Sequence, residues 1–211
     1  MLLIVKTFFG ITASVLVLVS YGFYIIDILD KKTKPHIFTW GLWFLIIFIL
    51  FLLQISKGAG AGSLPTLFVS LLCLTVFILS LIKEDDKNIK KVDIVFLILT
   101  LLAIPVWLLA KAPVASTIML ILVYSFAGQS TLRKSWVDPH SETISLWAIN
   151  SFRALISILA LSEYNFVTLA FPVLVFVSAL GFAIILVLRR RKVSKSKKFI
   201  NFIKSFYENT K

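Results

Sequence analysis

Cysteine, histidine and acidic side chains are scarce in this sequence. Its 211 residues include one cysteine, two histidines and ten aspartates or glutamates. The single Cys73 lies in an apolar run, which excludes a disulfide framework and a cysteine-rich metal site. The two histidines are 104 positions apart and have no clustered carboxylates, so they make a poor metal site. We predict that the chain holds neither a metal nor a cofactor.

The sequence also lacks the patterns of intramembrane enzymes. It contains no H-E-x-x-H motif, no pair of carboxylates inside an apolar segment, and no phosphate loop at the glycine-rich turn 57–62. The last apolar segment has no lysine that could form a retinal Schiff base, as a seven-helix photoreceptor requires. These absences predict that the protein is not an enzyme.

Apolar residues dominate what is present. They make up 59% of the chain, and the mean hydropathy is +0.99, whereas soluble domains contain about 45 to 50% apolar residues. Seven segments approach the roughly 20 residues that a spanning helix needs. They cover residues 8–29, 37–55, 64–83, 92–110, 113–129, 141–161 and 166–188. The chain is therefore expected to be an all-α membrane protein with seven transmembrane helices.

The net charge of +12 indicates topology in such a protein and does not predict nucleic-acid binding. With seven spans, 18 lysines and arginines fall on one side of the membrane and 3 on the other. Loops rich in lysine and arginine usually lie on the cytoplasmic side of the membrane. We predict an integral protein of the cell membrane with its amino terminus outside and its carboxyl terminus in the cytoplasm.

A motif of the form P-H-x-x-T-x-x-L-W occurs twice, at residues 35–43 and 139–147. Each copy belongs to the second of three consecutive apolar segments, so the chain reads as two three-helix units. The prolines are expected to begin their helices, where a missing N–H group costs nothing. The predicted parts are a first repeat (1–91), a linker helix (92–112), a second repeat (113–188) and a basic tail (189–211). A single linker helix makes the repeats parallel, and the space between parallel repeats is the usual place for a substrate path.

This layout resembles the PQ-loop superfamily, which includes the SWEET sugar transporters. The resemblance rests on the three-helix repeat, the inserted fourth helix, the external amino terminus and the lysine-rich cytoplasmic loop before a helix that begins with a hydroxyl residue. Counting back about fifteen positions from Thr143, as the family pattern requires, gives Gly128 and Gln129. The second copy keeps the glutamine, but neither copy keeps the proline, so the family's proline hinge has no matching proline here. The resemblance implies alternating access between the two repeats.

Arg153 is the outstanding candidate for a functional residue. It lies near the middle of the sixth segment, where an arginine costs about 2.5 to 3.5 kcal/mol on insertion scales. It could contact a solute or serve as a structural tie to a neighbouring helix. Asn150 precedes it by three positions and lies beside it on the helix surface. The first copy has Ile46 and Ile49 at these positions, so polar contacts are expected from the second half.

Tryptophan and hydroxyl side chains complete the predicted site. Thr143, Trp147 and Asn150 follow one line along the sixth segment, and Trp43 is the counterpart of Trp147. Tryptophans could stack on a solute or simply anchor the helices at the membrane interface. The predicted substrate-binding residues are Trp43, Gln129, Thr143, Trp147, Asn150 and Arg153.

The sequence therefore predicts a membrane transporter of a small polar solute, such as a sugar, an amino acid or another small metabolite. A receptor or assembly factor that does not transport is the alternative. The tail from Arg189 places apolar residues among lysines, which predicts either an amphipathic helix on anionic lipid or a disordered end. Expected partners are the lipid bilayer, that anionic lipid, the solute and a second copy of the chain in a homo-oligomer.

Overall fold

The computed structural model describes residues 2–33, 35–82 and 91–208. All regular structure within these residues is helical. The elements in chain order are α1 (Leu2–Leu29), α2 (Ile37–Ser56), η1 (Gly60–Ser63), α3 (Leu64–Ile82), α4 (Lys91–Leu108), α5 (Pro113–Ala127), α6 (Gln129–Val137), α7 (Ile144–Leu159) and α8 (Phe166–Glu208).

Four stretches are long and apolar enough to cross a membrane. They are Leu3–Leu29, Ile37–Ser56, Gly60–Ile82 and Phe166–Val193, and three shorter apolar helices accompany them in α4, α5 and α7. Large apolar side chains stay exposed on the outer surface, for example Phe8 and Ile98. Such a surface suits contact with lipid better than contact with water. The chain is thus an all-helical protein with helices suited to a membrane.

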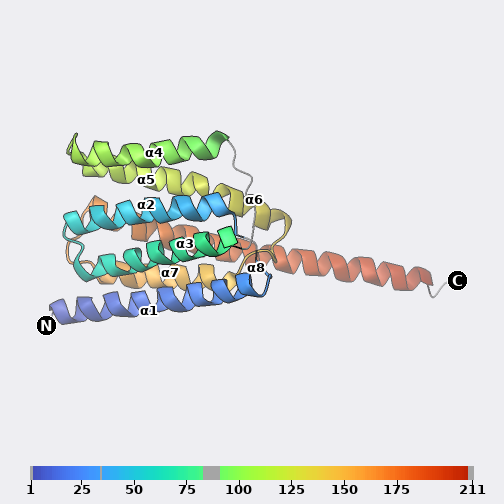
Figure 1. The fold of residues 1–211 in the computed structure, drawn as a ribbon. Helices are drawn as coiled ribbons and strands as arrows, with labels where there is room; N and C mark the ends of the chain where they lie inside the picture. The colour runs from blue at the N-terminus through green and yellow to red at the C-terminus, as the bar shows by residue number, and fades with distance from the viewer. Residues whose placement is uncertain (1, 34, 83–90, 209–211) are drawn as a thin grey trace.

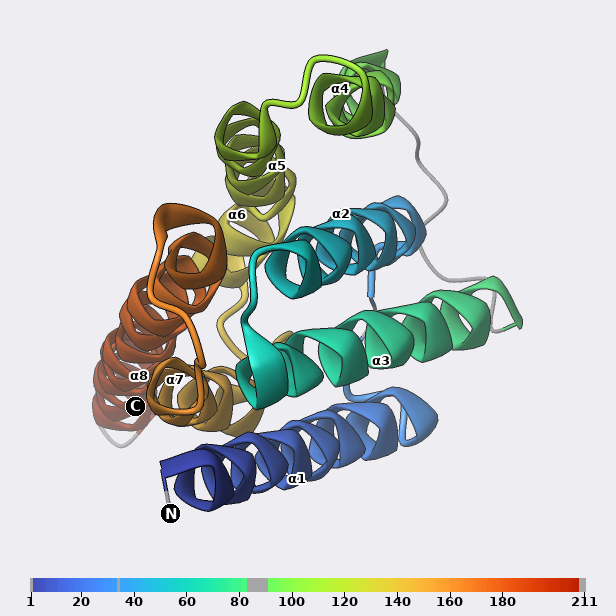
Figure 2. The same cartoon turned by 90° about the vertical axis from the view of Figure 1, so that its left-hand side faces the viewer.

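The helices pack side by side in one bundle (Figure 2). Helix α3 packs against both α1 and α2, and α8 packs against both α5 and α7. Helix α1 also packs on α7 and α2 on α5, while α4 lies at the edge of the bundle against α5 and α2.

Consecutive long helices run in opposite directions along one bundle axis (Figure 1). We call the two ends of the bundle the glycine end, with residues 57–63, 109–112 and 160–165, and the basic end, with residues 30–33, 128–143 and 189–190. The amino terminus lies at the glycine end, and α8 extends beyond the basic end (Figure 1).

Helix positions follow the predicted segments closely except near the second motif. Residues 129–137 form the short helix α6, which was expected to be partly a connecting loop, and α7 begins only at Ile144. The prediction that both prolines begin their helices is wrong. Helix α2 begins two residues after Pro35 with His36 as its N-cap, whereas Pro139 lies in the turn between α6 and α7.

The tail is a direct continuation of α8, which has no break up to Glu208. The described part of the tail is therefore helical, and the contact of an amphipathic tail helix with anionic lipid stays a prediction. The charged loop 83–90, which contributes to the predicted topology, lies outside the described residues, as does Lys34.

Candidate functional site

Arg153 lies in the middle of the bundle with only 3% of its surface exposed. Its Nε donates a hydrogen bond to Asn150 Oδ1 at 2.8 Å, and Asn150 Nδ2 donates to the carbonyl of Leu146 at 2.9 Å. Among the described residues the only ion pair joins Lys32 to Asp30 at the surface. The charge of Arg153 therefore has no carboxylate partner in the part of the protein that the structure describes.

A small central cavity of about 20 Å³ adjoins this arginine. Helices α1, α2, α3, α5, α7 and α8 contribute to its wall, which is rich in aromatic rings. Trp43 packs edge-on against Trp40, with ring centroids 5.2 Å apart, and stacks on Tyr124 at 5.3 Å. The wall includes aromatic and polar side chains that could contact a solute, namely Tyr21, Trp40, Trp43, Tyr124, Trp147, Asn150 and Arg153.

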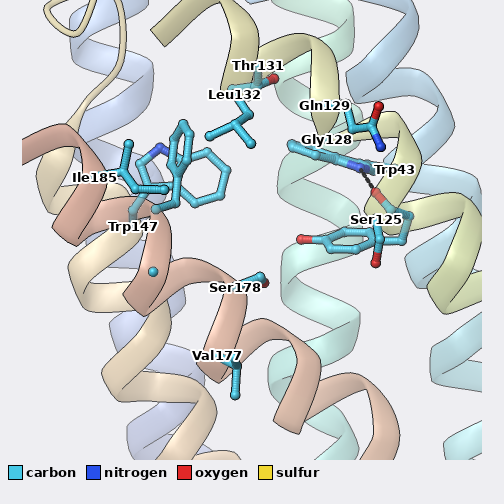
Figure 3. Close-up of a pocket in the computed structure, with 13 residues that line it drawn as sticks. Trp43, Ser125, Gly128, Gln129, Thr131, Leu132, Trp147, Val177, Ser178 and Ile185 are labelled. Carbon is cyan, nitrogen blue, oxygen red and sulfur yellow. Dashed lines mark hydrogen bonds between the residues drawn. The ribbon is translucent and has the colours of Figure 1, made fainter. Parts of the chain in front are cut away.

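A larger lateral cavity of about 270 Å³ lies between α5 and α8. Figure 3 shows Trp147 and Ile185 on one side of it and Trp43, Ser125 and Gln129 on the other. Its wall is almost entirely apolar. Val177 on its rim is 61% exposed, so the cavity opens at the outer surface of the bundle.

The two cavities are neighbours because they share part of their walls. Trp43, Tyr124, Trp147 and Ser178 line both of them. Trp43 Nε1 donates to the carbonyl of Tyr124 at 3.4 Å, as the dashed line in Figure 3 marks. Trp147 Nε1 is buried and has no hydrogen-bond partner among the described residues. A buried donor of this kind costs free energy until something accepts its proton.

Thr143 lies at the basic end, apart from both of these cavities. It is the N-cap residue of α7, and its hydroxyl donates a hydrogen bond to Asp27 Oδ2 at the end of α1. A polar cavity of about 400 Å³ adjoins this pair. Arg190 donates to the carbonyls of Pro139, at 2.9 Å, and Glu142, which ties the turn before α7 to α8.

The glycine end is packed much more closely. The backbone of Ser162 donates to the carbonyl of Ala59 at 3.0 Å, and Lys6 Nζ donates to the carbonyl of Ser162 at 3.2 Å. A Cβ atom added at Gly62 would lie 2.8 Å from the backbone nitrogen of Leu161. Such a distance is shorter than real Cβ contacts, so this position needs glycine for close backbone approach.

The structure brings together five of the six predicted site residues. Trp43, Trp147, Asn150 and Arg153 line the central cavity, and Gln129 joins the two tryptophans around the lateral cavity. Thr143 lies elsewhere, as described above. Sequence reasoning missed Tyr21, Tyr124, Ser178 and Phe182, which line these cavities.

One signal could have indicated the two tyrosines. A phenol in an apolar spanning segment brings a hydroxyl that seeks a partner, and Tyr21 finds one in Cys73 Sγ at 3.4 Å. Among the described residues no group of three or more histidine, cysteine or acidic side chains could hold a metal ion.

No protein-family model, no curated protein and no solved structure matches the chain.

Proposed function

We propose that the chain crosses the membrane seven times as two three-helix units, with α4 as the linker between them. The packing pattern supports this division, because the contacts of the first unit recur in the second. Helix α3 contacts α1 and α2 in the way that α8 contacts α5 and α7. In this division α1, α2 and α3 correspond to α5, α7 and α8. The contact of α1 with α7 then corresponds to the contact of α5 with α2, and both contacts are present. Parallel repeats related by an axis along the membrane normal have this symmetry.

The proposed function is transport of a small polar solute by alternating access between the two units. The single observation that carries it is the buried Arg153, which has no described counter-ion and faces a cavity lined by both units. An ionisable side chain inside a membrane protein is expensive and usually serves a solute or ion pathway. The PQ-loop resemblance predicts a solute path in the same place.

The difference between the two ends supports alternating access. The glycine end is closed by backbone contacts, whereas a polar cavity lies at the basic end and the lateral cavity opens between α5 and α8. A transporter holds such an asymmetric arrangement in one state and reverses it in the other. We propose that the basic end faces the cytoplasm of a cell and that the tail contacts anionic lipid there.

Sided labelling of single cysteines tests transport before any substrate is known. Cys73 is replaced by alanine, and Ser178, which lines both cavities, by cysteine. Tyr164→Cys and Asp138→Cys in the same background report the glycine end and the basic end, since both positions are exposed. The protein is reconstituted into vesicles, and a charged maleimide that cannot cross lipid is added on one side at a time.

A transporter should allow labelling of Ser178→Cys from both sides, each rate above that of a lipid-facing control such as Val173→Cys, which is 42% exposed. The two end markers should each react from one side only, which calibrates the orientation. If Ser178→Cys reacts from a single side under all conditions, transport is contradicted and the receptor or assembly-factor alternative is favoured.

A further inference from the structure

The chemistry of the central cavity indicates the charge of its ligand. Apart from the bond between Nε and Asn150, the guanidinium of Arg153 makes no hydrogen bond to a described residue. Trp147 also lines this cavity, and its Nε1 is a buried donor without a described acceptor. Both groups can only donate hydrogen bonds. A ligand that satisfies them must supply acceptor atoms, and an anion does this best.

The size of the central cavity limits that anion to one small group. About 20 Å³ is room for roughly one water-sized group. Among the side chains that the structure describes, Arg153 is the only lysine or arginine that lines either cavity, so these side chains would leave part of the charge of a doubly charged phosphate ester uncompensated. A carboxylate carries one charge and two acceptor oxygens, which match the fork geometry of a guanidinium.

The lateral cavity determines the rest of the ligand. Its wall is almost entirely apolar, and Trp147 packs on Phe182 there with ring centroids 4.4 Å apart. A cavity of about 150 Å³ accepts benzene, so about 270 Å³ holds an apolar ring with a short side chain. A sugar would bury several hydroxyl groups against a wall whose described polar side chains, aromatic residues aside, are only Ser125, Gln129, Thr131 and Ser178, and a buried hydroxyl without a partner costs free energy.

We propose that the site binds a carboxylate joined to an apolar body, with the carboxylate at Arg153 and the body in the lateral cavity. This inference rests on the proposed function, because it names the class of solute that the transporter would carry. The same chemistry occurs in soluble aromatic acids and in medium-chain fatty acids. The carboxylate and the apolar body would lie next to each other, because the two cavities share the wall formed by Trp43, Tyr124, Trp147 and Ser178.

Binding of 3-phenylpropionate to the purified protein in a neutral detergent tests the proposal by calorimetry. Its uncharged amide has the same shape and should bind at least about 10-fold more weakly, since hydrogen bonds to charged groups contribute more than neutral ones. Propionate lacks the apolar body and should also bind more weakly. Nonanoate has the same number of carbon atoms in a flexible chain, so it distinguishes a fatty acid from an aromatic acid.

Two kinds of variant test the carboxylate and the apolar body of the ligand separately. Arg153→Gln should remove the preference for the acid over the amide, and Arg153→Lys should restore part of it. Gly181 lines the lateral cavity and has open space beside it, so Gly181→Leu should fill the cavity and weaken binding of 3-phenylpropionate by about 10-fold or more. Gly22→Leu, which also meets open space but on α1, is the matched control and should leave binding unchanged.

Equal binding of acid and amide by the wild-type protein would overturn the proposal, and so would equal binding of propionate and 3-phenylpropionate. Failure of this inference is distinguishable from failure of transport. Sided labelling of Ser178→Cys needs no ligand, so reaction from both sides without acid binding rejects only the ligand class. Acid binding with reaction from one side rejects transport and leaves a receptor for the same carboxylates.

Discussion

The two ends of the bundle are held by different means. At the glycine end η1 packs backbone against backbone: a Cβ at Gly10 would lie 2.5 Å from the carbonyl oxygen of Ala61, and one at Gly62 would meet Leu161. At the basic end a few side chains such as Asp27 and Arg190 bridge a polar cavity of about 400 Å³. The glycine end is held by close backbone packing, whereas the basic end is held by individual hydrogen bonds around a polar cavity. Opening each end should therefore have a different energetic cost.

A covalent link across the glycine end should have the largest effect. A Cβ added at Gly58 would lie 3.6 Å from Glu163 Cβ, within the range of about 3.5 to 4.5 Å that disulfides use. Oxidised Gly58→Cys/Glu163→Cys protein should lose all labelling of Ser178→Cys from the glycine-end side and keep labelling from the other side. The experiment uses the Cys73→Ala background, with the maleimide applied after oxidation.

Each single variant and the reduced double variant are the controls, because Gly58 has a φ of 78° and any side chain there introduces strain. Unchanged two-sided labelling of the oxidised protein would show that the glycine end does not gate the cavity.

A single methyl group at Gly62 should have the next largest effect. Gly62→Ala forces the Cβ against the backbone of Leu161, and overpacking of this kind costs about 1 to 3 kcal/mol of the free energy of unfolding. Thermal denaturation in detergent should show a lower melting temperature. Gly22→Ala on α1, where nothing lies within 4 Å, should be neutral or stabilising because alanine favours helix. Equal melting temperatures for the two variants would refute the description of the glycine end as backbone-packed.

The long apolar helices could be predicted from the sequence because the bilayer fixes their length. Arg153 could be predicted as a site residue because a charged side chain in an apolar segment is costly and usually has a function. The positions of the small polar side chains could not. Ser125 Oγ donates to the carbonyl of Ile121 at 2.7 Å within its own helix, so a hydroxyl in a spanning segment does not reveal whether it faces a cavity.

The repeated motif shows a second limit of the sequence. Thr39 Oγ1 lies 3.0 Å from Nδ1 of His36, the residue that caps α2. Its counterpart Thr143 instead donates to Asp27, 116 positions away. The same residue in the same motif thus has a partner at the start of its own helix in one case and a partner in α1 in the other, which the sequence does not reveal.

The link between Asp27 and Thr143 should contribute a moderate stabilisation at the basic end. A double-mutant cycle with Asp27→Asn and Thr143→Val should give a coupling energy of about 1 to 2 kcal/mol, since a hydroxyl donates there to a carboxylate. The free energies of unfolding can be measured by denaturant titration in mixed micelles. The cycle of Asp27→Asn with Thr39→Val is the matched control and should show no coupling. Coupling in both cycles would mean that the two threonines share one environment.

The surface ion pair at the basic end should have the smallest effect. Lys32 Nζ lies 2.8 Å from Asp30 Oδ2, and both side chains are largely exposed. The hydrogen bond and the negative charge of Asp30 raise the pKa of Lys32 above its usual value. A raised pKa stabilises the folded protein fully below the unfolded pKa, and this stabilisation is lost only as the pH rises through the folded pKa.

Lys32→Gln should therefore show the same melting temperature as the wild type at physiological salt, without pH dependence between about pH 6 and 9, because exposed ion pairs are screened by water and salt. A difference in melting temperature that grows within this pH range would mean that the pair helps to hold the basic end together. Without such a difference, that end is held by the link from Asp27 to Thr143 and by the bonds that Arg190 makes to the turn before α7.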